Sequence, residues 1–158
     1  MSAKYCMTKC SSNNGKPCPI ASDCWLFKWD IAKQTGRKPT PKEVPSEAQE
    51  QKDFAQWLDR KGVLWFHIPN ERKATAVAIF ELTLQGLKKG VPDNFIAEPM
   101  GKYNGLFIEL KRAKKSLSKK SEEQKRWIKA LNEKGYKAVF CYGAEEAKRE
   151  VLKYLDEN

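Results

Sequence analysis

The spacing of apolar residues alternates between a helical period and short continuous runs, which predicts an ordered series of elements after residue 45. Helical spacing predicts helices over 46–60, about 72–84, 121–134 and a last one after Gly143. Short apolar runs predict strands at 63–68, 94–96, 106–110 and 137–142. This order favours an α/β domain with a central mixed sheet flanked by helices.

The same spacing predicts which helix positions face inward. The expected inward residues are Phe54, Trp57 and Leu58 in the first helix, Trp127, Ile128 and Leu131 in the third, and Ala147, Val151, Leu152 and Leu155 in the last. In the first helix, steps of one turn back from Phe54 and Leu58 reach Gln51 and Glu47. In the third helix, Gln124 falls on the same side as Trp127, Ile128 and Leu131. Each of these two helices is therefore expected to point a polar residue toward the sheet. The alternatives are a favourable first-turn charge for Glu47 and a reciprocal cap with Ser121 for Gln124.

Two predicted strands, 94–96 and 106–110, are separated by a turn-rich stretch from 99 to 105. Antiparallel pairing across this turn would bring Asp93 beside Glu109. We therefore expect two carboxylates to meet at one end of a hairpin.

Strand alternation places Glu109 and Lys111 on one face and Ile108 and Leu110 on the other. Asp93 and Glu109 offer the oxygen ligands that Mg²⁺ prefers, and the Leu110 carbonyl would complete the coordination. Lys111 would orient an attacking water or stabilise a developing oxyanion. The alternative is a surface ion pair of little energetic consequence. These residue types favour metal-assisted phosphodiester cleavage.

The pattern of Asp93 and Glu109-Leu110-Lys111 resembles that of the PD-(D/E)XK nucleases. Over residues 46–155 the chain is similar to the stand-alone, phage-type members of the VRR-NUC branch. The matching stretches are 46–51, 67–71, 90–93, 106–112, 118–124 and 135–136. The resemblance implies a restriction-endonuclease-like fold.

The resemblance also implies an activity and its residues. The expected enzyme is a Mg²⁺- or Mn²⁺-dependent DNA endonuclease that leaves 5′-phosphates, with Asp93, Glu109, Lys111, Gln124 and Glu47 in the active site. Glu47 would join Asp93 and Glu109 as a metal ligand. Similar stand-alone members act on branched DNA, often as homodimers, which implies a structure-selective enzyme for Holliday junctions or flaps in DNA repair or recombination.

His67 is the only histidine of the chain and lies in an aromatic stretch. A lone histidine in such a strand is more often a hydrogen-bonded structural residue than a base. The resemblance to phage-type members suggests a loop near the active site, so His67, Asn70 and Glu71 are expected to line it.

The formal net charge of +10 favours a polyanionic partner. Basic residues are concentrated directly after the predicted catalytic strand. Those expected to contact DNA phosphates are Arg112, Lys114, Lys115, Lys119 and Lys120. The alternative for this run is a solvated loop and a charged helix face.

Residues 1–45 are predicted to form a Cys-rich N-terminal extension and linker, followed by a nuclease domain over 46–158. Cys6, Cys10, Cys18 and Cys24 would supply four thiolates to a structural Zn²⁺ in a reducing compartment, or else remain free or redox-active. Cys141, in an apolar strand, is expected to be a buried and inert thiol.

No apolar run approaches membrane-spanning length and the N-terminus is too polar for a signal peptide, so we expect an intracellular protein of a bacterial or phage-infected cell. The competing functional hypothesis is a non-catalytic, zinc-bearing nucleic-acid-binding module or a recombination or replication accessory protein. In that case the carboxylates would be incidental to function.

Overall fold

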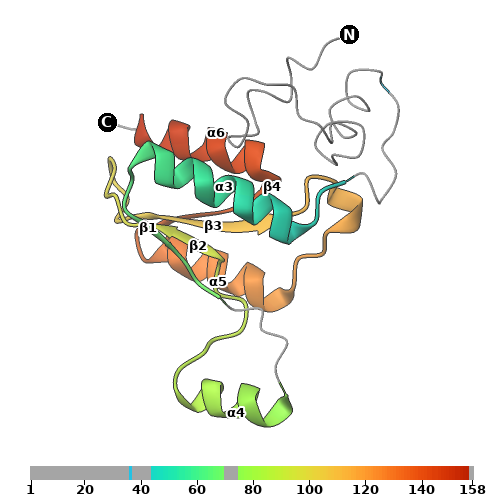
Figure 1. The fold of residues 1–158 in the computed structure, drawn as a ribbon. Helices are drawn as coiled ribbons and strands as arrows, with labels where there is room; N and C mark the ends of the chain where they lie inside the picture. Colours follow the sequence, from blue (N-terminus) through green and yellow to red (C-terminus); the bar gives the residue numbers. More distant parts are fainter. Residues whose placement is uncertain (1–35, 37–43, 70–74, 157–158) are drawn as a thin grey trace. The chain divides into compact units, whose positions relative to one another are not determined.

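Helices and short strands alternate along the chain in the computed structural model, which describes residues 36, 44–69 and 75–156 (Figure 1). In chain order the elements are α3 (Glu47–Lys61), β1 (Trp65–His67), α4 (Ala76–Leu84), β2 (Asn94–Ile96), β3 (Leu106–Lys111), the 3₁₀ helix η1 (Lys115–Leu117), α5 (Glu122–Glu133), β4 (Lys137–Tyr142) and α6 (Ala144–Leu155). This is the predicted α/β order, and the predicted fold class is confirmed.

The four strands form one mixed sheet in the order β1-β2-β3-β4. β2 pairs antiparallel with both β1 and β3, whereas β3 and β4 run parallel. Asn94 lies opposite Ile108 in the register of β2 and β3, so the predicted antiparallel pairing is confirmed. As an inner strand, β3 has its backbone hydrogen-bonded on both sides, which holds the residues along it in fixed positions.

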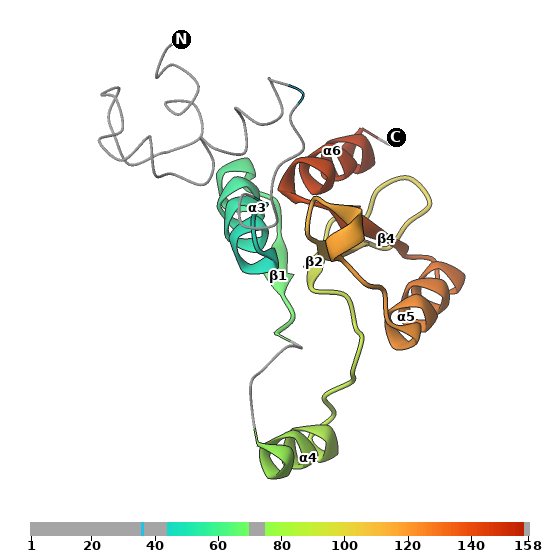
Figure 2. The same cartoon turned by 90° about the vertical axis from the view of Figure 1, so that its right-hand side faces the viewer.

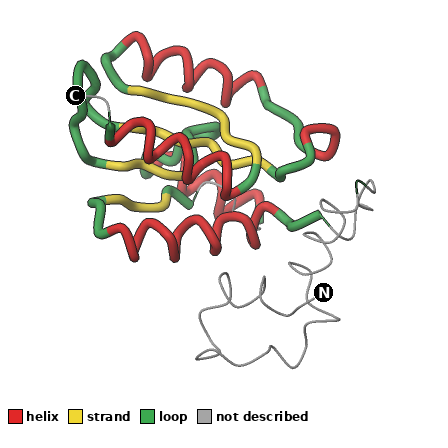
Figure 3. The backbone as a smooth tube through the Cα atoms, turned by 90° about the horizontal axis from the view of Figure 1, so that it is seen from above, coloured by secondary structure: helices red, strands yellow, loops and turns green. Residues whose placement is uncertain are grey.

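The sheet lies between α3 and α6 on one side and α5 on the other (Figure 1). Seen from above, α3 and α6 lie side by side (Figure 3). The core lies on the α3 and α6 side. Its buried members include Phe54 and Leu58 of α3, Ile96, Leu106, Ile108 and Leu110 of the sheet, and Ala147, Val151 and Tyr154 of α6. Alternation along β3 therefore leaves the opposite face of that strand for Phe107, Glu109 and Lys111.

Two expectations for the helix faces are wrong. Leu152 is 40% exposed, and Tyr154 is the fully buried residue of the last turn instead, with its hydroxyl donating to the Glu98 carbonyl. Ala147, Val151 and Tyr154 follow the i, i+4, i+7 spacing of one helix face, and Leu152 lies a third of a turn away. The expected stripe of α5 is only half-buried, because this helix packs on β4 and leaves its other side to solvent.

Element ends differ slightly from the predicted ones. β1 is shorter than the run at 63–68, and α4 begins at Ala76 because Thr75 is its N-cap and accepts a hydrogen bond from Ala78 N. Residues 72–74 lie outside the described residues. None of the described helices is long and apolar enough to cross a membrane.

Residues from Glu47 onward form a compact unit of their own. The predicted N-terminal extension, with Cys6, Cys10, Cys18 and Cys24, lies outside the described residues, so its zinc site stays a prediction.

Candidate active site

Glu109 and Lys111 form a buried ion pair on the α5 side of β3. Their exposed fractions are only 1% and 4%, and Lys111 Nζ lies 2.8 Å from Glu109 Oε1. The alternative of a surface ion pair is therefore wrong. Burying two charges is expensive in free energy unless they are paired, so a pair kept inside a small domain points to a functional role.

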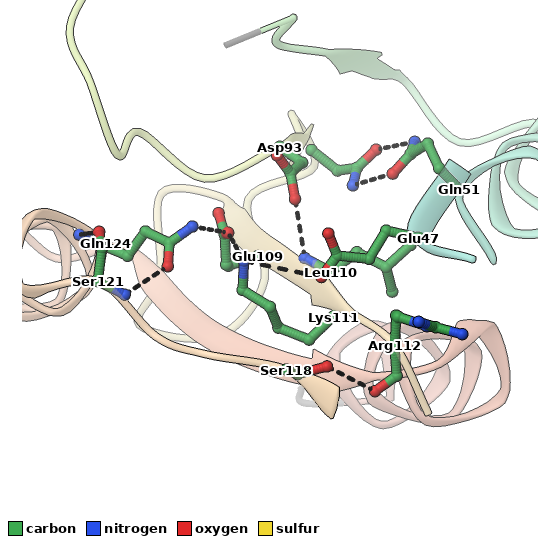
Figure 4. Close-up of polar contacts among 11 residues, drawn as sticks. Glu47, Gln51, Asp93, Glu109, Leu110, Lys111, Arg112, Ser118, Ser121 and Gln124 are labelled. Carbon is green, nitrogen blue, oxygen red and sulfur yellow. Dashed lines mark hydrogen bonds and ion pairs between the residues drawn. The ribbon is translucent and has the colours of Figure 1, made fainter. Parts of the chain in front are cut away.

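Asp93 is held against the same strand. Its Oδ2 accepts a hydrogen bond of 3.1 Å from Leu110 N (Figure 4). Its carbonyl oxygen accepts one of 2.7 Å from Ile68 N. The first bond links Asp93 to the backbone directly after Glu109. The expected meeting of these two acidic residues at one end of the hairpin is thus present.

Gln124 reaches the pair from the start of α5. Its side-chain Oε1 accepts a hydrogen bond of 2.9 Å from Ser121 N, while Ser121 Oγ accepts one of 3.2 Å from Gln124 N. Its Nε2 donates to Glu109 Oε1 (Figure 4). The Gln124 side chain thus both caps α5 and contacts Glu109, because an amide has an acceptor and a donor to share.

A close backbone approach fixes the position of Gln124. Gly90 has φ +84°, and a Cβ added there would lie 2.8 Å from Glu123 Cβ and 2.9 Å from Gln124 N. Only glycine fits both this conformation and this contact. The segment that leads to Asp93 is therefore pressed against the first turn of α5.

Glu47 is the first residue of α3 and faces the pair, as its helical position predicts. Its Oε1 lies 4.0 Å from Lys111 Nζ, and its side chain is 40% exposed. An acidic residue in a first helical turn is also favourable in itself. Glu47 is thus the solvent-facing carboxylate beside Lys111.

Sequence reasoning missed the contacts that anchor α3 beside the site. Gln51 and Asn94 exchange side-chain hydrogen bonds of 2.6 and 2.9 Å, and Asn94 is fully buried. Glu50, also buried, accepts a hydrogen bond of 2.7 Å from Ala144 N at the start of α6. The inward position of Gln51, four residues after Glu47, was the available signal for the amide pair.

The charges around Lys111 keep it protonated. Burial alone would lower the pKa of Lys111, but the hydrogen bond to Glu109 and the negative charges of Glu109, Glu47 and Asp93 raise that pKa above 10.5. Lys111 is therefore a fixed positive charge and hydrogen-bond donor at neutral pH.

Two cavities meet at Glu47 and Lys111. One, of about 320 Å³, is also lined by Asp93, Gln51 and the exposed His67. His67 thus borders the site as expected, whereas Asn70 and Glu71 lie outside the described residues.

The second cavity, of about 640 Å³, carries the basic residues. Three of the five predicted phosphate contacts line it, namely Arg112, Lys119 and Lys120. Lys114 and Lys115 are absent from its lining and lie at the start of η1. The basic run is therefore an open rim directly beside the carboxylates.

The donor groups fit a hard divalent cation, because carboxylate and carbonyl oxygens are what Mg²⁺ and Mn²⁺ take in proteins. Within the described ranges, however, no three His, Cys, Asp or Glu side chains are gathered closely enough to hold a metal ion. The Lys111 ammonium lies 2.8 Å from Glu109 Oε1 and 4.0 Å from Glu47 Oε1. Metal binding by Glu47, Asp93 and Glu109 stays a prediction.

Cys141 of β4 is a free, buried thiol, as expected. Burial raises its pKa to about 12, with a further contribution from the charge of Glu146. The thiol is thus inert at neutral pH.

Comparison with known proteins gives a family match and a structural match. The family model of the VRR-NUC domain matches residues 45–145, which include all five predicted catalytic residues. A solved structure of a VRR_NUC domain protein is similar to this chain with a TM-score of 0.62 and 26% identity, over 72% of this chain and 91% of the other. No curated protein matches.

Proposed function

The chain belongs to the VRR-NUC family of nucleases, and from that premise we propose that it is a Mg²⁺- or Mn²⁺-dependent DNA endonuclease. The observation that carries this proposal is the buried Glu109–Lys111 pair, with Asp93, Glu47 and Gln124 converging on it. A binding module would have no need to bury these charges.

Asp93, Glu109 and Glu47 would hold the cation, together with the Leu110 carbonyl. When bound, the cation would neutralise charge on the phosphate and lower the pKa of a water molecule. Gln124 keeps the Glu109 carboxylate oriented through its hydrogen bond, and the Leu110 N–H does the same for Asp93. These contacts prepare the carboxylates before the substrate arrives.

Lys111 would act as a cation in the reaction. Lys111 is buried and lines both cavities, and its raised pKa keeps its amine protonated. In that position it would donate to a phosphate oxygen and stabilise the charge that develops during cleavage. A general-base role is inconsistent with a protonated amine.

The substrate in this proposal is branched DNA, a junction or a flap, and the products carry 5′-phosphates. The resemblance to stand-alone members supports the branched substrate, and the rim of Arg112, Lys119 and Lys120 supports a phosphate backbone. An intracellular location belongs to the same proposal.

A second copy of the chain is the proposed partner. Helix α4 exposes large apolar side chains, with Val77 72%, Phe80 61% and Leu84 69% exposed, and none of its residues is buried. It stands apart from the sheet in two perpendicular views (Figures 1 and 2). Such an apolar surface is typical of an interface.

The deciding experiment is cleavage of labelled single-stranded, duplex, flap and four-way-junction DNA, and of matched RNA, with Mg²⁺, Mn²⁺ or EDTA. Asp93→Asn and Lys111→Met should each lower the rate by about 10²-fold or more, a typical loss when a stabilising group is removed from an active site. The matched controls are Lys153→Met on α6 and Asp156→Asn directly after it, and both should cut like the wild type.

The rival is the non-catalytic binding module. It predicts no metal-dependent cutting, together with salt-sensitive DNA binding that neither Asp93→Asn nor Lys111→Met alters. Zinc analysis of the full chain tests the separate prediction for Cys6, Cys10, Cys18 and Cys24, where absence of zinc contradicts the structural zinc site.

A further inference from the structure

Two aromatic side chains of β4 lie beside the catalytic pair. In the parallel register of β3 and β4, Phe140 is the partner of Glu109 and Tyr142 the partner of Lys111. Partners in a parallel pair point to the same face of the sheet. Phe140 and Tyr142 therefore extend the surface that carries the proposed active site, one strand further toward the sheet edge.

Two lysines of the basic run cover these rings. Lys120 Nζ lies 4.2 Å from the centre of the Phe140 ring and 5.4 Å from that of Tyr142, and Lys115 Nζ lies 4.8 Å from the Tyr142 ring. These distances are within the range of cation–π attraction. The rings thus hold two ammonium groups that belong to a segment with little regular structure.

The charge of these lysines is not neutralised by the protein. In the part of the chain that the structure describes, no carboxylate lies within 4.0 Å of Lys115 Nζ or Lys120 Nζ, although six other lysines form ion pairs. An aromatic face attracts an ammonium group without using up its hydrogen-bond donors. Both cations therefore remain able to bind an anion from outside.

The location connects this pair of cations to the chemistry. Lys120 lines the cavity of about 640 Å³ that also contains Lys111 and Glu47. The segment from Arg112 to Ser118, which carries Lys115 and leads to Lys120, is closed by a hydrogen bond of 3.2 Å from Ser118 Oγ to the Arg112 carbonyl (Figure 4). A strand with one phosphate at Lys111 would thus lead its next phosphates along this rim.

We propose that Phe140 and Tyr142 hold Lys115 and Lys120 as a binding subsite for a backbone phosphate that flanks the phosphate to be cleaved. The proposal rests on the nuclease function and deepens it. Long lysine side chains lose conformational entropy when they are fixed by a ligand, and rings that order them beforehand reduce that loss. The aromatic residues are therefore positioning residues, which act on the substrate through the lysines.

The test uses the full chain and compares DNA binding with cleavage. Binding is measured by fluorescence anisotropy in EDTA between about 50 and 200 mM salt, and cleavage by its KM and kcat. The double variant Phe140→Leu with Tyr142→Leu keeps apolar volume and removes the rings. It should raise Kd and KM by about 3- to 10-fold and reduce the salt slope by about 1 to 2, with kcat unchanged.

Further variants separate this role from folding. Lys115→Gln with Lys120→Gln should give the same shifts, and adding it to the aromatic double variant should change little more, because both act on one subsite. Phe107→Leu is the matched control, since this ring lies on the same sheet face and packs against Phe95 and Tyr136. Lys153→Gln is the control for lost charge.

Unchanged KM and salt slope in a folded aromatic variant would overturn the subsite and leave the nuclease intact. Equal shifts in Phe107→Leu would also overturn it, because the effect would then be a general disturbance of the sheet. If the wild type cuts no nucleic acid, the proposed function itself fails, and the two failures are thus distinguishable.

Discussion

At the scale of single residues, Gly90 connects the two halves of the proposed site. Its positive φ and its contact with the first turn of α5 exclude any side chain. We expect Gly90→Ala to lower the free energy of unfolding by about 1–3 kcal/mol and to lower the cleavage rate as well, because Gln124 must move. Urea denaturation and the cleavage assay measure the two effects.

Gly86 provides the control for this prediction. It has φ +104° with no atom within 4 Å of an added Cβ, so Gly86→Ala introduces backbone strain alone. The difference between the two variants isolates the collision with α5. Equal losses of stability with full cleavage in both would contradict the linkage of Gly90 to Gln124.

The buried thiol of Cys141 gives a pH-dependent prediction at the same scale. Its pKa rises from 9.0 to about 12 on folding, so the folded protein keeps its proton where the unfolded chain loses it. The stability that Cys141 contributes is therefore complete below pH 9.0 and is lost as the pH rises through about 12. Unfolding of Cys141→Ala measured from pH 8 to 10 should show a weaker decline than that of the wild type.

Chemical labelling checks the same property directly. At pH 8, iodoacetamide should leave Cys141 unmodified in the folded protein and modify it in urea, with peptide mass spectrometry separating it from the other cysteines. Rapid modification of Cys141 in the folded protein would show that its thiol is accessible.

At the scale of elements, local rules predicted what depends on local sequence. Alternation placed Glu109 and Lys111 on one face of β3, and the spacing of Ser121 and Gln124 predicted the cap of α5. Helical spacing indicated the inward position of Gln51 but not its partner Asn94, because the pair joins residues 43 positions apart and depends on how α3 packs on the sheet. Metal binding by the carboxylates depends on their coordination chemistry, which neither the sequence pattern nor the packing of the side chains determines.

This amide pair leads to a prediction about the anchoring of α3. Asn94 follows Asp93 in the chain, and Gln51 lies one turn after Glu47. The amide pair therefore holds α3, which carries Glu47, against β2, which begins directly after Asp93. Asn94→Leu leaves the half-buried Gln51 amide without its partner and should destabilise the fold by about 1–3 kcal/mol. Adding Gln51→Leu should recover part of that loss, with a coupling free energy of about 0.5–3 kcal/mol.

Cleavage should not follow stability in this series. The double variant replaces the amide pair with two apolar side chains, which lack the geometry of the hydrogen-bonded amides. We therefore expect its cleavage rate to stay low while its urea midpoint rises back toward that of the wild type. Gln56→Leu, at an exposed position of α3, is the matched control. Full cleavage in the double variant would show that the amide pair serves stability alone.

At the scale of the whole molecule, charge and apolar surface are separated. The cations of the basic rim border the proposed active site, whereas α4 contains no basic residue and a single acidic one, Glu81. A chain with a net charge of +10 repels its copies, and α4 has no basic side chain that would add to that repulsion. Association of two copies through α4 would leave both basic rims available to DNA.

Replacing the exposed apolar residues of α4 tests this arrangement. Light scattering after gel filtration should give the wild type a mass of twice 18.2 kDa, and Val77→Ser with Phe80→Ser should give a single chain. Because a four-way junction needs two cuts, the variant should lose paired incisions and keep single cuts in a flap. Leu152→Ser, which removes an exposed apolar side chain from α6, should remain a dimer. A wild type that stays a single chain at tens of micromolar, or a variant that still makes paired cuts, would contradict the dimer.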